Sequence, residues 1–297
     1  MVVQKLKSVL KWVAPYGIVE LSRNIRRDYK YSNLYLKYKH PETLSVLGKN
    51  KILKDIHKNQ RCFILGTGPS INKIDINKLK NEKCIFLSQF YLHENYLTIN
   101  PSYHLFSGRA PHLNGKATHA DWINFFNQIE DRVSTKTLLF MNYLDKKFIE
   151  DNGFFAKHNV HYFYFKKNLH NVFKSRIDAM QVIYGASGIP IMAIQIALYM
   201  GFKEIYLLGI DGCNDKATKA SHFYDRQKSL VDELGEAPAD VLSDFYKLGT
   251  ELRAFLSLLD EFSLLRKFAE NNGCNIYNAT RGGVVEAFTR VDFDSLF

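Results

Sequence analysis

Short apolar runs alternate with longer amphipathic or apolar segments from residue 60 onward. Runs typical of buried strands occur at 61–65, 84–87, 103–106, 137–141, 161–165, 204–208 and 275–277. Helical patterns are seen at 71–79, where a helix start is predicted, and at 189–200 and 246–272. The last two are closed by Gly201 and Gly273. This alternation predicts an α/β fold, with a single Rossmann-like, mainly parallel sheet flanked by helices.

A basic amphipathic segment precedes this domain. Residues 1–31 mix apolar and basic side chains, and Pro15 and Gly17 divide them into two short helical pieces. Residues 1–40 carry nine Lys and Arg against two acidic residues, which accounts for seven of the ten net positive charges. Such a segment suits the headgroup region of an anionic membrane, and packing on the main domain is the alternative. We predict a basic helical extension over 1–50 and one domain over 51–297.

Composition excludes several classes of protein. The chain has 297 residues, 46% apolar and 24% charged, which is ordinary for a globular protein and excludes a disordered one. Four cysteines without a CxxC spacing indicate neither a zinc site nor a disulfide framework. No apolar run reaches the roughly 18 residues that span a bilayer. Charge is nearly balanced beyond residue 40, so nucleic-acid binding is not predicted. From the cysteines, the missing membrane span and the basic N-terminal segment, we expect a cytoplasmic protein that is peripheral on the inner membrane face.

Two glycine-containing loops stand where a phosphate could bind. Gly66-Thr-Gly-Pro-Ser70 follows the first strand and leads into the predicted helix start, where free amides favour an anion. Tyr184-Gly-Ala-Ser-Gly188 precedes the apolar helix, and Ser187 suits either an N-cap or a ligand contact. Each loop could equally be a tight capped turn, but two such loops at neighbouring strand ends are more specific than one.

A third motif carries the candidate chemistry. Gly209-Ile-Asp-Gly212 follows the strand at 204–208, and His222 lies eleven residues after Asp211 in a polar stretch. A histidine there is a candidate general base because its ordinary pKa lies near neutral pH. Ligands of parallel α/β sheets bind beyond the carboxyl ends of the strands, so the three motifs predict one site.

Together these motifs resemble a known group of proteins. Residues 61–290 are similar to the bacterial sialyltransferases of glycosyltransferase family 42. They are more similar to the related 6-hydroxymethylpterin diphosphokinase MptE-like domains, many of which are associated with surface polysaccharide synthesis. The resemblance implies a GT-A-like variant of the fold. It rests on Gly66–Ser70, Ser88–Tyr91, Asn142–Tyr143, Ala186–Gly188, Met200–Asp211, His222–Tyr224, Ile276–Gly283 and Phe288–Val291.

The resemblance implies roles for particular residues. His222 is the implied base, with Tyr224 and Asp211 as further catalytic residues. The implied nucleotide-binding residues are Gly66, Thr67, Gly68, Ser70, Ser88, Gln89, Ser107, Asn142, Ala186, Ser187 and Gly188. The family commonly has other residues at the positions of Thr67, Ser88, Ser107, Tyr184 and Cys213. These departures remove donor contacts of the sialyltransferases.

The implied activity is an inverting glycosyl transfer in lipopolysaccharide or capsule synthesis. The donor would be a CMP-linked, sialic-acid-like nucleotide sugar, and the acceptor a glycan or glycolipid. Candidates to stabilise the leaving phosphate are Tyr224, Tyr184, Arg226 and Arg109. Residues 212–245 are expected to form a lid. No cofactor is required on this interpretation, and both Mg²⁺ and a homo-oligomer are compatible with it.

Two alternatives stay open. An MptE-like diphosphokinase would need Mg²⁺, for which Asp211 and Asp215 are the candidate ligands. A non-catalytic nucleotide-sugar-binding module, attached to the membrane through residues 1–31, would explain the departures from the family's pattern.

Overall fold

The computed structural model describes residues 40–109, 117–167, 177–185, 188–212, 222–224 and 241–297, without the side chains of 166–167 and 241–254. The chain divides by its contacts into two units, residues 1–46 and 47–297. The described part of the first unit is residues 40–46, and residues 41–46 belong to helix α3 (Pro41–Gly48). The sheet and the two cavities described below lie in the second unit.

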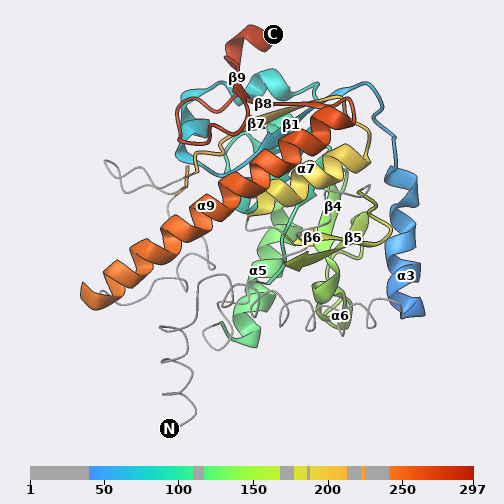
Figure 1. Ribbon diagram of the computed structural model, residues 1–297. Coiled ribbons are helices and arrows are strands. Elements are labelled where there is room, and N and C mark those ends of the chain that lie inside the picture. Colours follow the sequence, from blue (N-terminus) through green and yellow to red (C-terminus); the bar gives the residue numbers. More distant parts are fainter. Residues whose placement is uncertain (1–39, 110–116, 168–176, 186–187, 213–221, 225–240) are drawn as a thin grey trace, which may run out of the picture. The chain divides into compact units, whose positions relative to one another are not determined.

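One nine-stranded sheet runs through the described part of the second unit (Figure 1). Its order is β6-β5-β4-β3-β2-β1-β7-β8-β9, and every neighbouring pair is parallel. The strands are β1 (Arg61–Leu65), β2 (Cys84–Leu87), β3 (Tyr103–Leu105), β4 (Leu138–Asn142), β5 (Val160–Lys167), β6 (Val182–Gly185), β7 (Glu204–Leu208), β8 (Asn275–Asn278) and β9 (Thr289–Arg290). The predicted α/β, Rossmann-like class is confirmed. All seven predicted strands are present, and β6 and β9 were not predicted.

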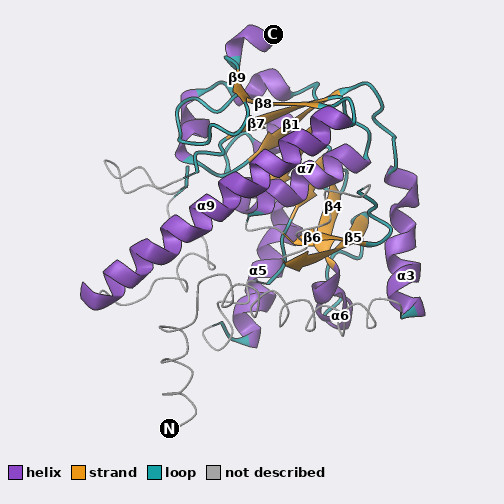
Figure 2. Cartoon of the chain, in the orientation of Figure 1, coloured by secondary structure: helices purple, strands orange, loops and turns teal. Residues whose placement is uncertain are grey.

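Helices cover both faces of the sheet (Figure 2). The α-helices of the second unit are α4 (Tyr96–Ile99), α5 (His119–Arg132), α6 (Lys146–Asp151), α7 (Ile189–Tyr199) and α9 (Val241–Asn271). The 3₁₀ helices are η1 (Lys49–Leu53), η2 (Pro69–Lys73), η3 (Ile76–Leu79), η4 (Ser88–Leu92), η6 (Tyr143–Asp145) and η9 (Asp294–Leu296). In Figure 1, α7 and α9 run side by side across one face.

The alternation of side chains along β1 explains the two layers of core. Cys62 and Ile64 point into the cluster that contains the apolar residues of α7 and α9. Phe63 and Leu65 point into the opposite cluster, which contains the aromatic residues of α5. A strand covered on both faces must be apolar at every position, so the continuous run Cys62–Leu65 is fully buried.

The helix predicted over 71–79 was wrong. The structure has two 3₁₀ helices there, η2 and η3, interrupted by Ile74, whose backbone is extended. Asp75 starts the second one by accepting a hydrogen bond from the Asn77 amide at 3.1 Å. This local bond offers the backbone an alternative to a continuous helix. No α-helix therefore begins after the first glycine-containing loop, and the helix-end contribution to anion binding is missing there.

Candidate functional site

The strand order places a topological switch between β1 and β7. The chain proceeds from β1 through β6 in one direction and returns to β7 on the other side of β1. Ligands of such sheets bind at the carboxyl ends of the strands at this point. A cavity of about 410 Å³ lies there, which is within the usual size range of small-molecule sites. The motifs predicted from the sequence therefore meet a cavity at the expected edge.

Four segments line this cavity. They are the loop after β1 (66–68), the end of β2 (87–88), the start of α7 (188–190) and the loop after β7 (209–212), joined by His222 and Leu258. Of the predicted site residues, it therefore contains Gly66, Thr67, Gly68, Ser88, Gly188, Asp211 and His222.

The loops after β1 and β7 are locked together by backbone hydrogen bonds. Leu65 pairs with Leu208 in the parallel register, so the two loops begin side by side. The Gly66 amide donates to Leu208 O at 2.8 Å, and the Gly68 amide donates to Gly209 O at 2.9 Å. Both amides are therefore already paired with β7 and the loop that follows it, and the assignment of Gly66 and Gly68 to the nucleotide stays a prediction.

Close approach of the two loops explains the glycines. A Cβ on Gly66 would lie 2.6 Å from Gly209 O, and a Cβ on Gly68 would lie 1.8 Å from Asp211 Oδ2. Gly209 itself has φ +65° and its Cβ would lie 2.5 Å from Gly66 O. These contacts are too short for any side chain, so the glycines are required for the loops to interlock.

His222 is joined to the first loop. Its Nδ1 lies 2.9 Å from Thr67 Oγ1, and the amide of the next residue, Phe223, donates to Thr67 O at 2.9 Å. The His222 ring stacks on Tyr224 with centroids 5.0 Å apart and an angle of 2° between the planes. If Nδ1 carries the proton and donates to Thr67 Oγ1, the lone pair of the imidazole lies on Nε2, as a general base requires.

Phe223 anchors this short segment in the described core. Its ring packs against Phe90 and His93, with centroids 5.1 Å away in both cases. Asn72 Nδ2 also donates to Phe223 O, at 3.4 Å. Sequence reasoning missed this role, because nothing in the sequence shows that Phe90 and His93 lie beside the His222 segment.

Asp211 joins the loop after β7 by hydrogen bonds to the segments that contain Ser70 and Val284. Ser70 Oγ donates to Asp211 Oδ2 at 2.8 Å, and the Val284 amide donates to Asp211 O at 2.8 Å. Burial raises the pKa of Asp211 above its ordinary value, although the hydrogen bonds from Ser70 oppose that shift. Ser70 and Asp211 therefore have a structural task in forming the cavity wall, and Asp211 also lines the cavity.

Ser88 lines the cavity at the end of β2, whereas Gln89 is buried behind it. Ser88 has a left-handed backbone with φ +54°, and its hydroxyl donates to Gln89 Oε1. Its carbonyl accepts a hydrogen bond from His104 Nε2 at 2.8 Å, and His104 Nδ1 accepts from Tyr96 at 2.7 Å. Burial lowers the pKa of His104 to about 3, so this ring is neutral and fixes the Ser88 carbonyl. No residue pattern had indicated His104.

Ser107 and Asn142 do not reach the cavity. Asn142 Nδ2 donates to Ser107 O at 2.7 Å, and Asn142 Oδ1 accepts from the Leu144 amide at 3.0 Å. Ser107 follows β3, Asn142 is the last residue of β4, and these strands are two and three positions away from β1. With neighbouring strands about 4.8 Å apart, β4 is roughly 14 Å from the switch point. Ser107 and Asn142 bond to each other outside the cavity lining, and their assignment to the nucleotide stays a prediction.

Tyr184 and Arg109 are also engaged elsewhere. The Tyr184 hydroxyl is buried and donates to Glu261 Oε1 on α9 at 2.9 Å. Arg109 pairs with Asp145, with its Nε 2.8 Å from Oδ1, and lies over the Phe148 ring. Neither residue lines the cavity, so neither is placed to stabilise a leaving phosphate.

Several predicted features lie outside the described residues. They are Ala186, Ser187, Cys213, Asp215, Arg226 and the predicted lid over 212–245, apart from Gly212, the segment 222–224 and residues 241–245. Within the described ranges, no group of three or more His, Cys, Asp or Glu side chains is arranged to hold a metal ion. No helix in those ranges is both long and apolar enough to cross a bilayer.

Comparison with known proteins gives distant structural likenesses only. No protein-family model matches the chain, and no curated protein matches it. A solved structure titled "Structure of MAf glycosyltransferase from Magnetospirillum magneticum AMB-1" is similar, with a TM-score of 0.46 and 15% identity. The match covers 82% of this chain and 37% of that chain, so our chain spans little more than a third of its length. The assignment to family 42 or to the MptE-like domains stays a prediction.

Proposed function

We propose that the chain is a glycosyltransferase that binds a nucleotide-activated sugar in the cavity at the β1–β7 switch point. The hydrogen bond between Thr67 Oγ1 and His222 Nδ1, at 2.9 Å, carries the proposal. It holds a group that can accept a proton near neutral pH against the glycine-containing loop. The cavity offers the volume for a ligand beside that group.

The reaction is a single displacement with inversion. His222 Nε2 removes the proton from an acceptor hydroxyl while the hydroxyl oxygen forms a bond to the anomeric carbon. The bond from that carbon to the phosphate oxygen breaks, and the electron pair leaves with the nucleotide. Thr67 would keep the imidazole in the required tautomer and orientation, and Phe223 would hold the segment in place through its contacts with Phe90 and His93.

The finer assignment follows the resemblance noted in the sequence. The favoured donor is a CMP-linked, sialic-acid-like sugar, and the acceptor is a glycan or glycolipid of the bacterial surface. Membrane attachment through residues 1–31, cytoplasmic location and a homo-oligomer belong to the same proposal. The diphosphokinase and the non-catalytic binding module are the alternatives that the experiment must separate.

Ligand-dependent thermal stabilisation distinguishes these functions. The full chain is screened against CMP, UDP, GDP and ATP and their sugar conjugates, with and without Mg²⁺. Stabilisation by CMP-linked sugars supports the transferase, and stabilisation by ATP only with Mg²⁺ supports the diphosphokinase. Binding of a nucleotide sugar without transfer to any acceptor supports the binding module. A chain that responds to none of these ligands contradicts all three.

Variants then test the role of His222. His222→Ala is expected to abolish transfer and to leave the ligand-induced shift in melting temperature nearly intact. Thr67→Val should lower turnover because it removes the hydroxyl that is hydrogen-bonded to His222 Nδ1. Thr67→Ser keeps a hydroxyl there and should retain most of the turnover. His119→Ala, which changes an exposed histidine on α5, is the matched control. Full turnover by His222→Ala would remove this residue from the mechanism.

A further inference from the structure

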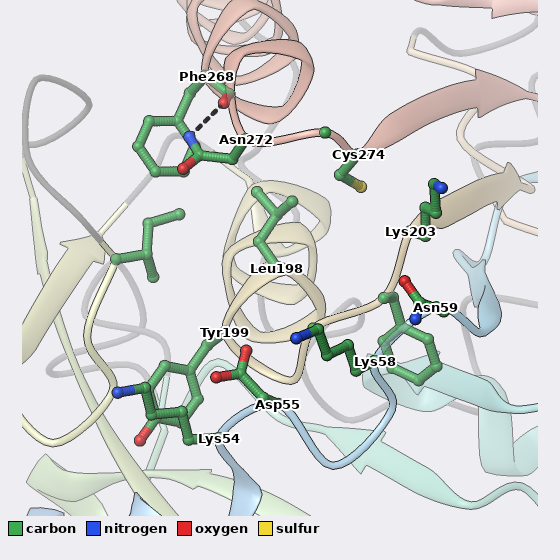
Figure 3. Close-up of a pocket in the computed structure, with 14 residues that line it drawn as sticks. Lys54, Asp55, Lys58, Asn59, Leu198, Tyr199, Lys203, Phe268, Asn272 and Cys274 are labelled. Atoms are coloured by element: carbon green, nitrogen blue, oxygen red, sulfur yellow. Dashed lines mark hydrogen bonds between the residues drawn. The ribbon is translucent and has the colours of Figure 1, made fainter.

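A second cavity lies at the opposite edge of the sheet. It has a volume of about 330 Å³ and is formed where residues 54–59 lead into β1 and where the turns after α7 and α9 lead into β7 and β8. Lys54, Lys58 and Lys203 belong to its lining (Figure 3). In that view Lys54 and Lys203 lie on opposite sides, with Lys58 between them. This edge is separate from the candidate site, which lies at the carboxyl ends of the strands.

Backbone hydrogen bonds hold the lysine-bearing turn in place. The Asp55 amide donates to Tyr199 O at 3.1 Å, and the Lys203 amide donates to Gln60 O at 2.9 Å. Gly201 has φ +87°, and a Cβ there would lie 3.0 Å from the Asp55 Cα. The turn and the end of α7 therefore form one rigid support, and the lysines are displayed on it.

This edge has an excess of positive charge. Lys49 and Lys51 precede the turn, so the segment 49–58 together with Lys203 carries five ammonium groups and one carboxylate, that of Asp55. None of the five lysines forms an ion pair with a described residue. The ends of α7 and α9 add about half a negative charge each. The lysines outweigh the carboxylate and both helix ends together.

The same segment exposes two large apolar side chains. Ile52 is 67% exposed and Ile56 is 43% exposed. A single exposed apolar residue is ordinary, but here two exposed isoleucines lie within the segment 49–58, which also carries four lysines. A nucleic acid would engage the lysines through its phosphates, whereas an anionic bilayer engages both kinds of side chain: its headgroups attract lysines and its interface takes up apolar side chains.

We infer that residues 49–58 and Lys203, called here the basic edge, form a docking surface for an anionic lipid bilayer. Proximity in sequence supports this assignment, because only helix α3 separates the segment from the strongly basic residues 1–40. Docking through this edge leaves the carboxyl ends of the strands, and the candidate site, on the side away from the lipid. The inference does not depend on the activity of that site.

Vesicle sedimentation with the full chain tests the inference. Vesicles of phosphatidylcholine alone are compared with vesicles that also contain phosphatidylglycerol, at low and high salt. Near an anionic surface each lysine multiplies the partition coefficient by roughly fivefold. The triple variant Lys54→Gln/Lys58→Gln/Lys203→Gln should therefore bind roughly a hundredfold more weakly, the product of three such factors. Ile52→Asp/Ile56→Asp should bind more weakly at both salt concentrations, because the contribution of the isoleucines is not screened.

Matched variants control for charge and for exposure. Lys73→Gln/Lys146→Gln/Lys147→Gln removes three positive charges from segments that follow the carboxyl ends of β1 and β4. Leu97→Asp/Leu144→Asp changes two leucines that are 66% and 60% exposed. The controls should bind like the native chain, and circular dichroism checks that every variant is folded.

Three results would overturn the inference. The basic-edge variants could bind as tightly as the native chain, or the charge control could lose as much affinity as the triple lysine variant. Alternatively, inorganic phosphate or glycerol phosphate could stabilise the native chain but not the triple variant, with vesicle binding unchanged. That last result would identify a site for a soluble phosphate instead of a lipid surface.

Discussion

Replacing Gly68 by alanine tests whether the cavity wall is formed by interlocked loops. The new Cβ would lie 1.8 Å from Asp211 Oδ2 and 2.6 Å from Gly209 O. The carboxylate could turn away, but only by giving up its hydrogen bond from Ser70 Oγ. The Gly209 carbonyl is backbone at the end of β7, so the loop after β1 must move and the Gly68 amide loses its acceptor.

The cost follows from these three contacts. A hydrogen bond to a charged group contributes about 1.5–3 kcal/mol, and a neutral backbone one contributes about 1 kcal/mol. Overpacking of a tight site adds about 1–3 kcal/mol. Because the three losses share one movement, we expect a total of about 3–5 kcal/mol, which is a large part of the roughly 5–15 kcal/mol that stabilises a domain.

Urea unfolding followed by circular dichroism measures this loss. The control is Gly48→Ala, because Gly48 has φ −57° and a Cβ there would meet nothing within 4 Å. That variant should change the free energy of unfolding by less than about 1 kcal/mol. Gly68→Ala should also abolish nucleotide-induced stabilisation. A loss below about 1 kcal/mol for Gly68→Ala would refute the interlocked arrangement.

Three further predictions address positioning, burial and pH. Phe223→Ala should lower turnover about 10- to 100-fold with little change in KM, because the Phe223 ring positions His222. Phe223→Leu should recover part of the lost turnover. Equal turnover in the native chain and both variants contradicts this role. Tyr184→Phe should lower the free energy of unfolding by about 1–2 kcal/mol and leave nucleotide binding unchanged, measured by urea unfolding and thermal shift. Burial holds the pKa of His104 at about 3 in the folded chain, so only the unfolded chain takes up its proton as the pH falls below 6.5. Stability should therefore fall from pH 7 to pH 5 with a steeper slope in the native chain than in His104→Gln, and equal slopes would contradict this.

Much of the fold could be predicted from the sequence because it depends on local patterns. Buried strands such as Cys62–Leu65 must be apolar on both faces, and this makes them visible as continuous runs. Helices commonly end where a glycine takes up a left-handed backbone, so the ends of α7 and α9 were predictable from residue type alone. Gly201 and Gly273 indeed have φ +87° and +73°. The extended Ile74 was not predictable, because η2 and η3 lack the length over which a helical period can be recognised.

The details of the site depend on which strands are neighbours. The sequence indicates that Gly66 and Gly209 follow strands, but not that Leu65 pairs with Leu208. Only that register shows that the loop amides are already paired with β7. Likewise, Asn142 lies at the carboxyl end of a strand, and the strand order places it beside Ser107 at some distance from the cavity. Residues were assigned to the correct edge of the sheet, and the position along that edge required the structure.

The pairing of the Gly66 and Gly68 amides shifts the expected ligand contacts toward side chains, and Ser88 offers the sharpest test. Ser88 lines the cavity, its hydroxyl donates to Gln89 Oε1, and its backbone has φ +54°, a conformation that costs a non-glycine residue roughly 1–2 kcal/mol. Ser88→Gly removes the hydroxyl and relieves this conformational cost. Ser88→Ala also removes the hydroxyl, but the conformational cost remains.

The two variants therefore separate stability from binding. Without ligand, Ser88→Gly should be more stable than Ser88→Ala by about 1 kcal/mol in urea unfolding. If the hydroxyl contacts the nucleotide, both variants should lose nucleotide-induced stabilisation to the same extent, because the missing atom is the same. If Ser88→Gly binds nucleotide as tightly as the native chain, the residue matters only through its backbone. Phosphate recognition would then have to come from another part of the cavity.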